Sequence, residues 1–236
     1  QWHQGAPFKL RFPISTSWTI WAPPGCVTIA VAQIMNYHQF PRNYCDWSLV
    51  NQYNPKKLLE ENDQDVLDEV ALLSKKVAGG CRVECNFFGS GETFSTPAKA
   101  KRFLRDMGYT GTEKHLGYDA DVIKTTLNKG CPVFIGALSS SNHGHAWVID
   151  GYLNYENIIK TYNGPATLLE TKTVNKLFVH CNWGWQSTRK NGYYASKVFD
   201  TRNGPADLSG YPVATRGIDT KNYTWWFRIV TYNKPR

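Results

Sequence analysis

Residues 21–38 read WAPPGCVTIAVAQIMNYH, a Pro/Gly loop followed by an apolar run. The run is apolar almost all round and stops before Pro41, which predicts a buried central helix that begins at Cys26. A helix start leaves backbone N–H groups unpaired and carries partial positive charge, so a cysteine there is held more readily as the thiolate. The position suits a nucleophile. An inert core cysteine is the open alternative.

Two β-like segments of the second half carry a histidine and an asparagine. Residues 142–152 read NHGHAWVIDGY, and residues 177–185 read LFVHCNWGW. With Cys26 they give the order Cys, His, Asn, in which an imidazole takes the thiol proton and an amide orients the imidazole. His145 follows Cys26 by about 120 residues and Asn182 follows it by about 155, close to the papain-like separation. The papain signature around the nucleophile itself is absent, so a close papain relative is excluded.

Four motifs in the same order resemble the streptopain family of bacterial secreted cysteine peptidases, within the papain-like superfamily. They are GCV at residues 25–27, AQIMNYH at 32–38, GHAWVIDG at 144–151 and NWGW at 182–185. Residues 1–8, QWHQGAPF, resemble the amino-terminal motif of the mature family members. The likeness covers nearly the whole chain.

The resemblance implies a role for each matched residue. Cys26 would be the nucleophile, and His145 the general base and then the general acid. Asn182 would orient His145, while Trp183 would shield that hydrogen bond from water. Gln4 would donate to the oxyanion.

The resemblance also implies a substrate cleft. Residues 87–93, FFGSGET, resemble the Ser/Gly-rich cleft wall of the family. The residues expected to bind substrate are Ser90, Gly91, Glu92, Gly144, Trp183 and Trp185. The chain departs from the family at Glu92 and Thr93, where the family has smaller residues, and at residues 203–220, where a glycine-rich loop is expected but few glycines occur. Both departures bear on substrate range.

The patterning predicts an α+β fold over residues 1–236, taken as one mature catalytic domain without its propeptide. Helical spacing at residues 65–78, and the helix that the resemblance implies at 97–108, predict a helical lobe over about 1–130 that carries Cys26. Antiparallel β-strands are expected in a second lobe, over about 131–236, that carries His145. The expected strands are 132–138, 146–152, 176–182, 192–195 and 224–232, with turns at 150–151, 163–164 and 203–204.

Two local expectations complete the pattern. Residues 46–49 look like a short strand or turn. Trp225 and Trp226 are expected to pack in the core, and Trp183 and Trp185 to line the cleft.

Charge and cysteine usage limit the partners. The net charge of +8 comes from scattered basic residues without a nucleic-acid motif, so we expect a solvated surface and no nucleic-acid partner. Six cysteines allow at most two bridges beside a free Cys26, and Cys81 with Cys85 is the only local pair. We expect no metal and no cofactor, since the Cys81/Cys85 spacing lacks its usual second half.

Partners and location follow from the resemblance and from the short apolar runs. Protein or peptide substrates are expected, together with the chain's own propeptide or a propeptide-like inhibitor. The chain has no expected membrane span and would be secreted or lie at a bacterial cell surface. A thiol transamidase and a catalytically silent binding or adhesion module on the same fold remain as alternatives to an endopeptidase.

Overall fold

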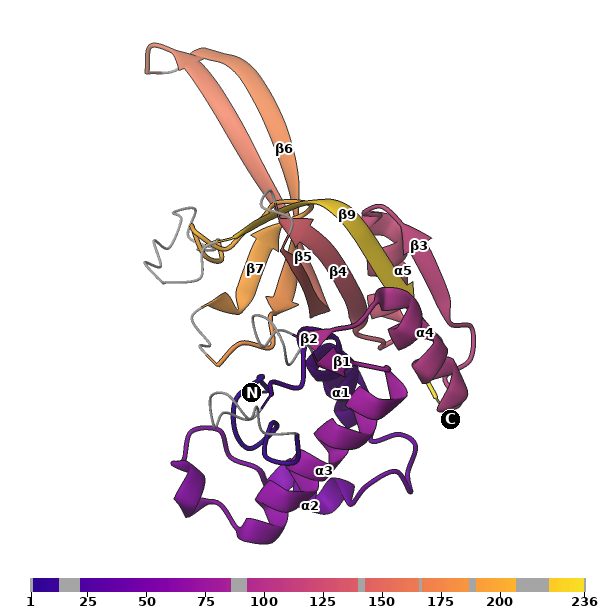
Figure 1. Cartoon of the computed structure of the whole chain (residues 1–236). Coiled ribbons are helices and arrows are strands. Elements are labelled where there is room, and N and C mark those ends of the chain that lie inside the picture. Colours follow the sequence, from indigo (N-terminus) through magenta and orange to yellow (C-terminus); the bar gives the residue numbers. More distant parts are fainter. Residues whose placement is uncertain are drawn as a thin grey trace.

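The computed structural model describes residues 2–12, 22–85, 93–139, 143–165, 167–186, 190–206 and 221–235. Helices α1 to α3 gather at one end of the molecule, and an antiparallel sheet stands above them with α4 and α5 beside it (Figure 1). This mixed arrangement confirms the predicted α+β class. The helices are α1 (Cys26–His38), α2 (Trp47–Gln52), α3 (Gln64–Gly80), α4 (Pro97–Asp106) and α5 (Ala120–Asn128), with a 3₁₀ turn at Leu59–Glu61.

The sheet is antiparallel, with strand order β3-β9-β4-β5-β6-β7, and β8 pairs with β9. Its strands are β3 (Glu113–Leu116), β4 (Val133–Ser139), β5 (Gly144–Asn163), β6 (Thr167–Asn182), β7 (Gly192–Ala195), β8 (Phe199–Asp200) and β9 (Asn222–Thr231). A separate two-stranded ladder pairs β1 (Glu84–Cys85) with β2 (Thr93–Phe94). The five strands expected from the sequence are all present, although β5 and β6 are much longer than expected.

Helix α1 is the central helix that the apolar run predicts. It begins at Cys26, and Ile29, Val31 and Ile34 are almost completely buried. Helices α2, α3 and α4 pack with α1 on one face of the sheet, where Phe134, Ala146 and Val148 enter the same core cluster. Alternate residues of β4 and β5 therefore turn to the opposite face, as strand periodicity requires.

The opposite face of the sheet holds a second, aromatic core cluster. It contains Trp147, Trp183, Tyr194, Phe199, Tyr223 and Phe227, with Ile123 from α5 beside them. Their rings pack closely in tilted, edge-on and stacked pairs, for example Trp147 tilted by 30° against Trp183 with centroids 4.5 Å apart. This aromatic layer packs directly against the ring of His145, which lies on the same face of β5 as Trp147.

Two local expectations are wrong. Residues 46–49 form no strand: Asp46 caps α2, its carboxylate accepting from the backbone N–H groups of Ser48 at 2.9 Å and Leu49 at 3.2 Å. An Asp at a helix start favours this capped turn over an extended segment. The Asp150-Gly151 pair is not a turn, because β5 continues through it with a register shift between Ile149 and Gly151.

The Asn163-Gly164 turn is confirmed, with Gly164 at φ 68° between β5 and β6. None of the helices in the described part of the chain is long and apolar enough to cross a membrane.

Candidate active site

Cys26 is the first residue of α1, as the sequence predicts. Gly25 before it adopts φ +86°, a conformation that glycine reaches without strain. A Cβ at Gly25 would also lie 2.8 Å from Thr93 Oγ1. Glycine therefore lets the loop pass close to β2 and deliver the thiol to the helix start.

Burial decides the acidity of Cys26. It raises the pKa of the thiol above its ordinary value of 9.0, while backbone hydrogen bonds from Ala146, Val27 and Cys26 itself act to lower it. The helix start thus acts in the expected direction, but the pKa of the thiol as a whole is raised, so the thiolate is not favoured as the sequence led us to expect. The backbone donors are present, but desolvation outweighs them. A base must take the proton before this sulfur can attack.

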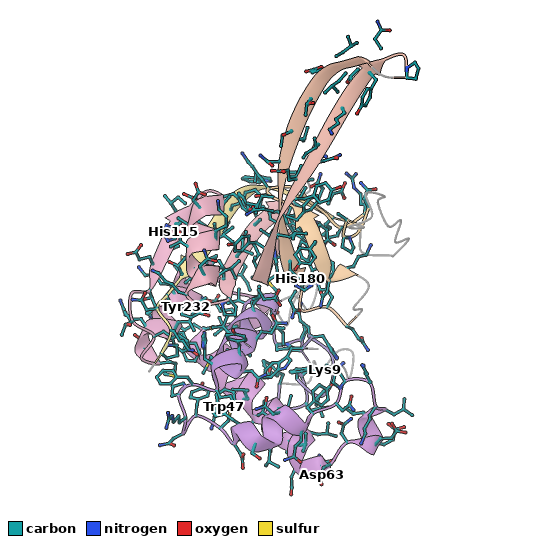
Figure 2. The ribbon with its side chains drawn as sticks, turned by 180° about the vertical axis from the view of Figure 1, so that it is seen from behind. Lys9, Trp47, Asp63, His115, His180 and Tyr232 are labelled. Atoms are coloured by element: carbon teal, nitrogen blue, oxygen red, sulfur yellow. The ribbon has the colours of Figure 1, made fainter. Side chains whose placement is uncertain are left out.

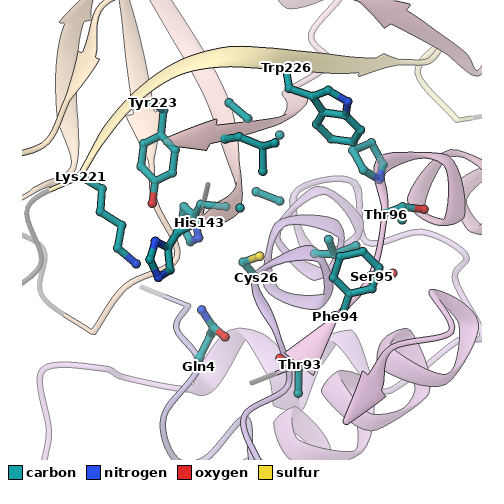
Figure 3. Close-up of a pocket in the computed structure, with 18 of the residues that line it drawn as sticks. Gln4, Cys26, Thr93, Phe94, Ser95, Thr96, His143, Lys221, Tyr223 and Trp226 are labelled. Carbon is teal, nitrogen blue, oxygen red and sulfur yellow. The ribbon is translucent and has the colours of Figure 1, made fainter. Parts of the chain in front are cut away.

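A pocket of 750 Å³ opens at Cys26 between the helical part and the sheet. Figure 3 shows the Gln4 amide pointing toward the Cys26 sulfur from the amino-terminal segment. The sheet contributes residues of β4, β5 and β9, and the helical part contributes Cys26, Val27 and the stretch that joins β2 to α4. The site thus lies where the two core clusters meet.

Gln4 is positioned by its neighbours in the chain. Phe8 is fully buried in the helical core, and the Gly5 N–H donates to His3 Nδ1 at 3.0 Å. Burial lowers the pKa of His3 to about 4, which keeps that nitrogen an acceptor at neutral pH. The short turn around Gln4 is therefore held on both sides.

His145 lies at the entry of β5 and lines the same pocket. Its ring is 8% exposed and lies among the rings of Trp183, Trp185 and Tyr223, with centroids at 6.0, 5.0 and 5.8 Å. Its Nε2 lies 2.9 Å from the carbonyl oxygen of Trp183. Because a carbonyl can only accept, Nε2 carries a proton, and Nδ1 is the nitrogen that can take one up.

The carbonyl that orients His145 belongs to a small amide network. Asn182 Oδ1 accepts from Gln33 Nε2 of α1 at 3.1 Å and from Asn191 Nδ2 at 3.3 Å. Asn191 Oδ1 in turn accepts from the Trp183 N–H at 3.0 Å. Asn182 therefore holds Asn191, and Asn191 holds the backbone N–H of Trp183, the residue whose carbonyl meets the imidazole. A direct contact from Asn182 to His145 stays a prediction.

The expected substrate-binding residues divide into three groups. Gly144 and Trp185 line the pocket. The prediction that Trp183 lines the cleft is wrong, because its side chain is fully buried in the aromatic cluster behind His145. Ser90, Gly91 and Glu92 lie outside the described residues, as does most of the 203–220 segment.

Several pocket residues escaped the sequence reasoning. The helical wall includes Phe94, and β9 with the residue before it supplies Lys221, Tyr223 and Trp226. Trp225 and Trp226 are not core residues, since they are 45% and 41% exposed. Trp226 has φ +54°, so the local backbone breaks the alternation on which the core prediction relied. Adjacent residues of a strand point to opposite faces, so the Trp225-Trp226 pair itself indicated that the two side chains do not share one core.

The other histidines near the site differ in position. His143 is exposed and lines the pocket, with its backbone N–H donating to Ser139 Oγ at 3.2 Å. His180 lies on β6 with its Nδ1 against the Asp150 carboxylate.

Cys81 is a buried free thiol, so it does not form the local disulfide bridge with Cys85 that the spacing allowed. Within the described ranges, no cluster of three His, Cys, Asp or Glu side chains could hold a metal ion.

Comparison with known proteins agrees with this geometry. No curated protein matches the chain. Residues 2–194 match the Peptidase C10 family, a span that includes Gln4, Cys26, His145 and Asn182. The chain therefore belongs to the Peptidase C10, or streptopain, family of cysteine peptidases.

Proposed function

We propose that this chain is a secreted cysteine endopeptidase that hydrolyses peptide bonds through a thioester on Cys26. The observation that carries the proposal is the convergence of Cys26, Gln4 and His145 on one pocket, with the His145 tautomer set by the Trp183 carbonyl. The family membership adds the reaction class. The two-lobe papain-like arrangement, with Cys26 on the helical lobe and His145 on the β lobe, is part of the same proposal.

The first half of the reaction acylates the sulfur. His145 Nδ1 takes the thiol proton of Cys26, and the thiolate attacks the scissile carbonyl carbon to give a tetrahedral oxyanion. As the carbon–nitrogen bond breaks, the imidazolium returns its proton to the departing amine. The acyl group is left on Sγ as a thioester.

The second half of the reaction uses water. His145 removes a proton from water as it attacks the thioester, and the proton passes to the sulfur that leaves. The carboxylic acid product and the free thiol result. Gln4 Nε2 and backbone N–H groups at the start of α1 would donate to the oxyanion in both halves.

Asn182 and Asn191 act on His145 through the backbone of Trp183, which Asn191 holds at its N–H. When the imidazole carries both protons, the Trp183 carbonyl accepts its Nε2 proton in a nearly dry setting of tryptophan rings. A hydrogen bond to a charged donor in such a setting is stronger than one between neutral groups. Holding that carbonyl in place therefore stabilises the state that attacks.

Location and partners extend the proposal. Secretion, and inhibition by a propeptide or a propeptide-like protein, are proposed from the family. Substrates would be unfolded or extended protein segments. The open pocket admits them between Phe94 on the helical side and Trp226 on the sheet side.

An epoxide inhibitor of thiol peptidases tests the proposal. At neutral pH it should add one equivalent to Cys26, identified by peptide mapping, and should abolish casein hydrolysis. Product analysis with and without an added amine then separates hydrolysis from transamidation. Unlabelled Cys26 with casein intact would contradict the peptidase assignment.

Gln4→Ala should lower the turnover number by about 10²- to 10³-fold with a nearly constant Michaelis constant, because an oxyanion donor acts only as charge develops. Steady-state kinetics on a peptide ester or amide measures both constants. Gln64→Ala, on the exposed start of α3, is the matched control and should change neither. If Gln4→Ala slowed the alkylation of Cys26 as much as it lowered the turnover number, the amino-terminal segment would have a packing role instead of a catalytic one.

Asn191→Ala should slow turnover about tenfold, because each hydrogen bond it supplies is worth about 0.5–1.5 kcal/mol and the backbone of Trp183 would loosen. The loss should also appear as slower alkylation of Cys26 at neutral pH, recovering at alkaline pH. Asn175→Ala, on an exposed part of β6, is the control. A fall in melting temperature without any change in the pH profile of alkylation would limit Asn191 to a structural role.

A further inference from the structure

The most unusual part of the molecule is a two-stranded hairpin arm, residues 153–165 of β5 and its turn with residues 167–177 of β6. It projects well beyond the body of the protein (Figures 1 and 2). Residues 154–163 are all exposed. The arm plays no part in the pocket and has no role in the proposed reaction.

The arm exposes an unusual number of apolar side chains to solvent. Ile158 and Tyr162 are each 53% exposed, and further apolar side chains stand open along it, namely Tyr155, Ile159, Leu168 and Leu169. A lone two-stranded hairpin is at best marginally stable in water. Apolar side chains on such a hairpin indicate a surface that another polypeptide covers.

Both edges of the arm carry unpaired backbone groups. The pairing of β5 with β4 ends at Ile149, and the pairing of β6 with β7 begins at Phe178. Among the described residues, no strand pairs with the side of Asn154–Asn163 that faces away from β6. This side is called the β5 edge here.

The two edges are not equally suited to pairing. On β6 the ladder shifts between Glu170 and Leu168, so Leu169 bulges out, and Lys172 and Lys176 stand along the strand. Bulges and lysines are the usual protection of an exposed edge. On β5 the residues from Gly151 to Thr161 pair without interruption. The β5 edge therefore has no bulge between Gly151 and Thr161, and it carries a single lysine, Lys160, together with the acidic Glu156.

The charged side chains of β5 are placed so that two antiparallel copies of this strand complement each other. Glu156, Ile158 and Lys160 alternate along β5 and so share one face. Only one antiparallel register of two copies brings Glu156 opposite Lys160, and it is centred on Ile158. That register places both opposite-charge pairs around a central Ile158–Ile158 contact, and cross-strand pairs of these kinds stabilise sheets.

We propose that two copies of this chain associate through their β5 edges, joining the two hairpins into one four-stranded antiparallel sheet with a two-fold axis at Ile158. In this register Asn154 of one copy meets Tyr162 of the other, so almost the whole exposed run is paired. The tip of each arm then lies at the root of the other. Such an isologous contact closes on itself and stops at a dimer.

Sedimentation velocity of the full chain tests the proposal. The wild type should sediment as a dimer at about 100 μM. Glu156→Lys and Lys160→Glu should each weaken the dimer by on the order of tenfold or more, because like charges then face each other twice. Mixing the two single variants, or combining both changes in one chain, should restore it. Glu170→Lys, on the β6 edge, is the matched control and should leave association unchanged.

A cross-link gives a second readout. Ile158→Cys should form a covalent dimer on oxidation, since the two-fold axis brings its copies together. Thr173→Cys lies opposite Ile158 on β6 and faces the same side, yet should give none. A monomeric wild type overturns the proposal, whichever other partner the arm then binds. A dimer that is indifferent to both charge reversals overturns it as well.

Discussion

Cys26→Ala should abolish peptidase activity, with the turnover number falling by at least ~10⁴-fold, because no other cysteine lines the pocket among the residues that the structure describes. The fold should survive. The side chain is small, lies at a helix start and is only partly buried, so few contacts are lost. Casein hydrolysis and far-ultraviolet circular dichroism of the purified variant measure the two effects.

Cys45→Ala is the matched control for this change. Cys45 is also partly buried, and burial together with nearby Glu69 raises its pKa to about 12, yet it does not line the pocket. Its loss should leave activity intact. Residual hydrolysis by Cys26→Ala near the wild-type level would remove the thiol from the mechanism.

His145→Ala should lower turnover by a similarly large factor and should slow alkylation of Cys26 at pH 7 by about 100-fold or more. Without the imidazole, the thiol keeps the raised pKa that burial gives it, above the ordinary 9.0. At pH 7 a thiol of pKa 9 is about 1% ionised, and its alkylation rate rises about tenfold for each pH unit up to its pKa. The wild type should instead react well at neutral pH, because imidazole shares the proton.

Alanine replacement of His143 and His180 separates the three histidines. His180 lies against Asp150 on β6, away from the pocket, so its loss should leave the alkylation profile unchanged. His143 lines the pocket and is the stricter control. An inactive His143 variant beside an active His145 variant would transfer the role of the base to His143.

The sequence predicts those features that depend on local pattern. A continuous apolar run closed by proline produces α1 from Cys26, and alternation produces the strands that carry His145 and Asn182. The convergence of these residues on one pocket depends on how the helices and the sheet pack together. Only the family resemblance anticipated it.

Other features depend on opposing effects whose relative size cannot be read from a sequence pattern. The helix start supplies donors to Cys26, but the depth of the site makes desolvation the larger contribution to its pKa. Trp183 and Trp185 are two residues apart with similar chemistry, yet the turn at Gly184, with φ +67°, buries the first and leaves the second at the pocket. A Cβ at Gly184 would lie 2.8 Å from Ile29 Cγ2, so close approach to α1 sets this turn.

The hairpin arm was missed for a different reason. Residues 153–176 carry a mixed polar and apolar pattern without a buried face, so alternation signals only the parts of β5 and β6 that lie in the body. The Asp150-Gly151 pair suggested an early turn, whereas the strand absorbs it as a bulge. Pairing between the two long strands, which depends on both sequences together, extends the ladder to the tip.

Acid quenching of the wild-type chain during turnover of an activated peptide ester, followed by mass spectrometry of its peptides, tests the central claim most directly. The account predicts one acyl group, attached to the peptide that contains Cys26 and released by hydroxylamine as a thioester should be. The same experiment on Cys26→Ala should give no adduct. An acyl group on another residue, or turnover of the ester without any adduct and with Cys26 unreactive, would contradict the account.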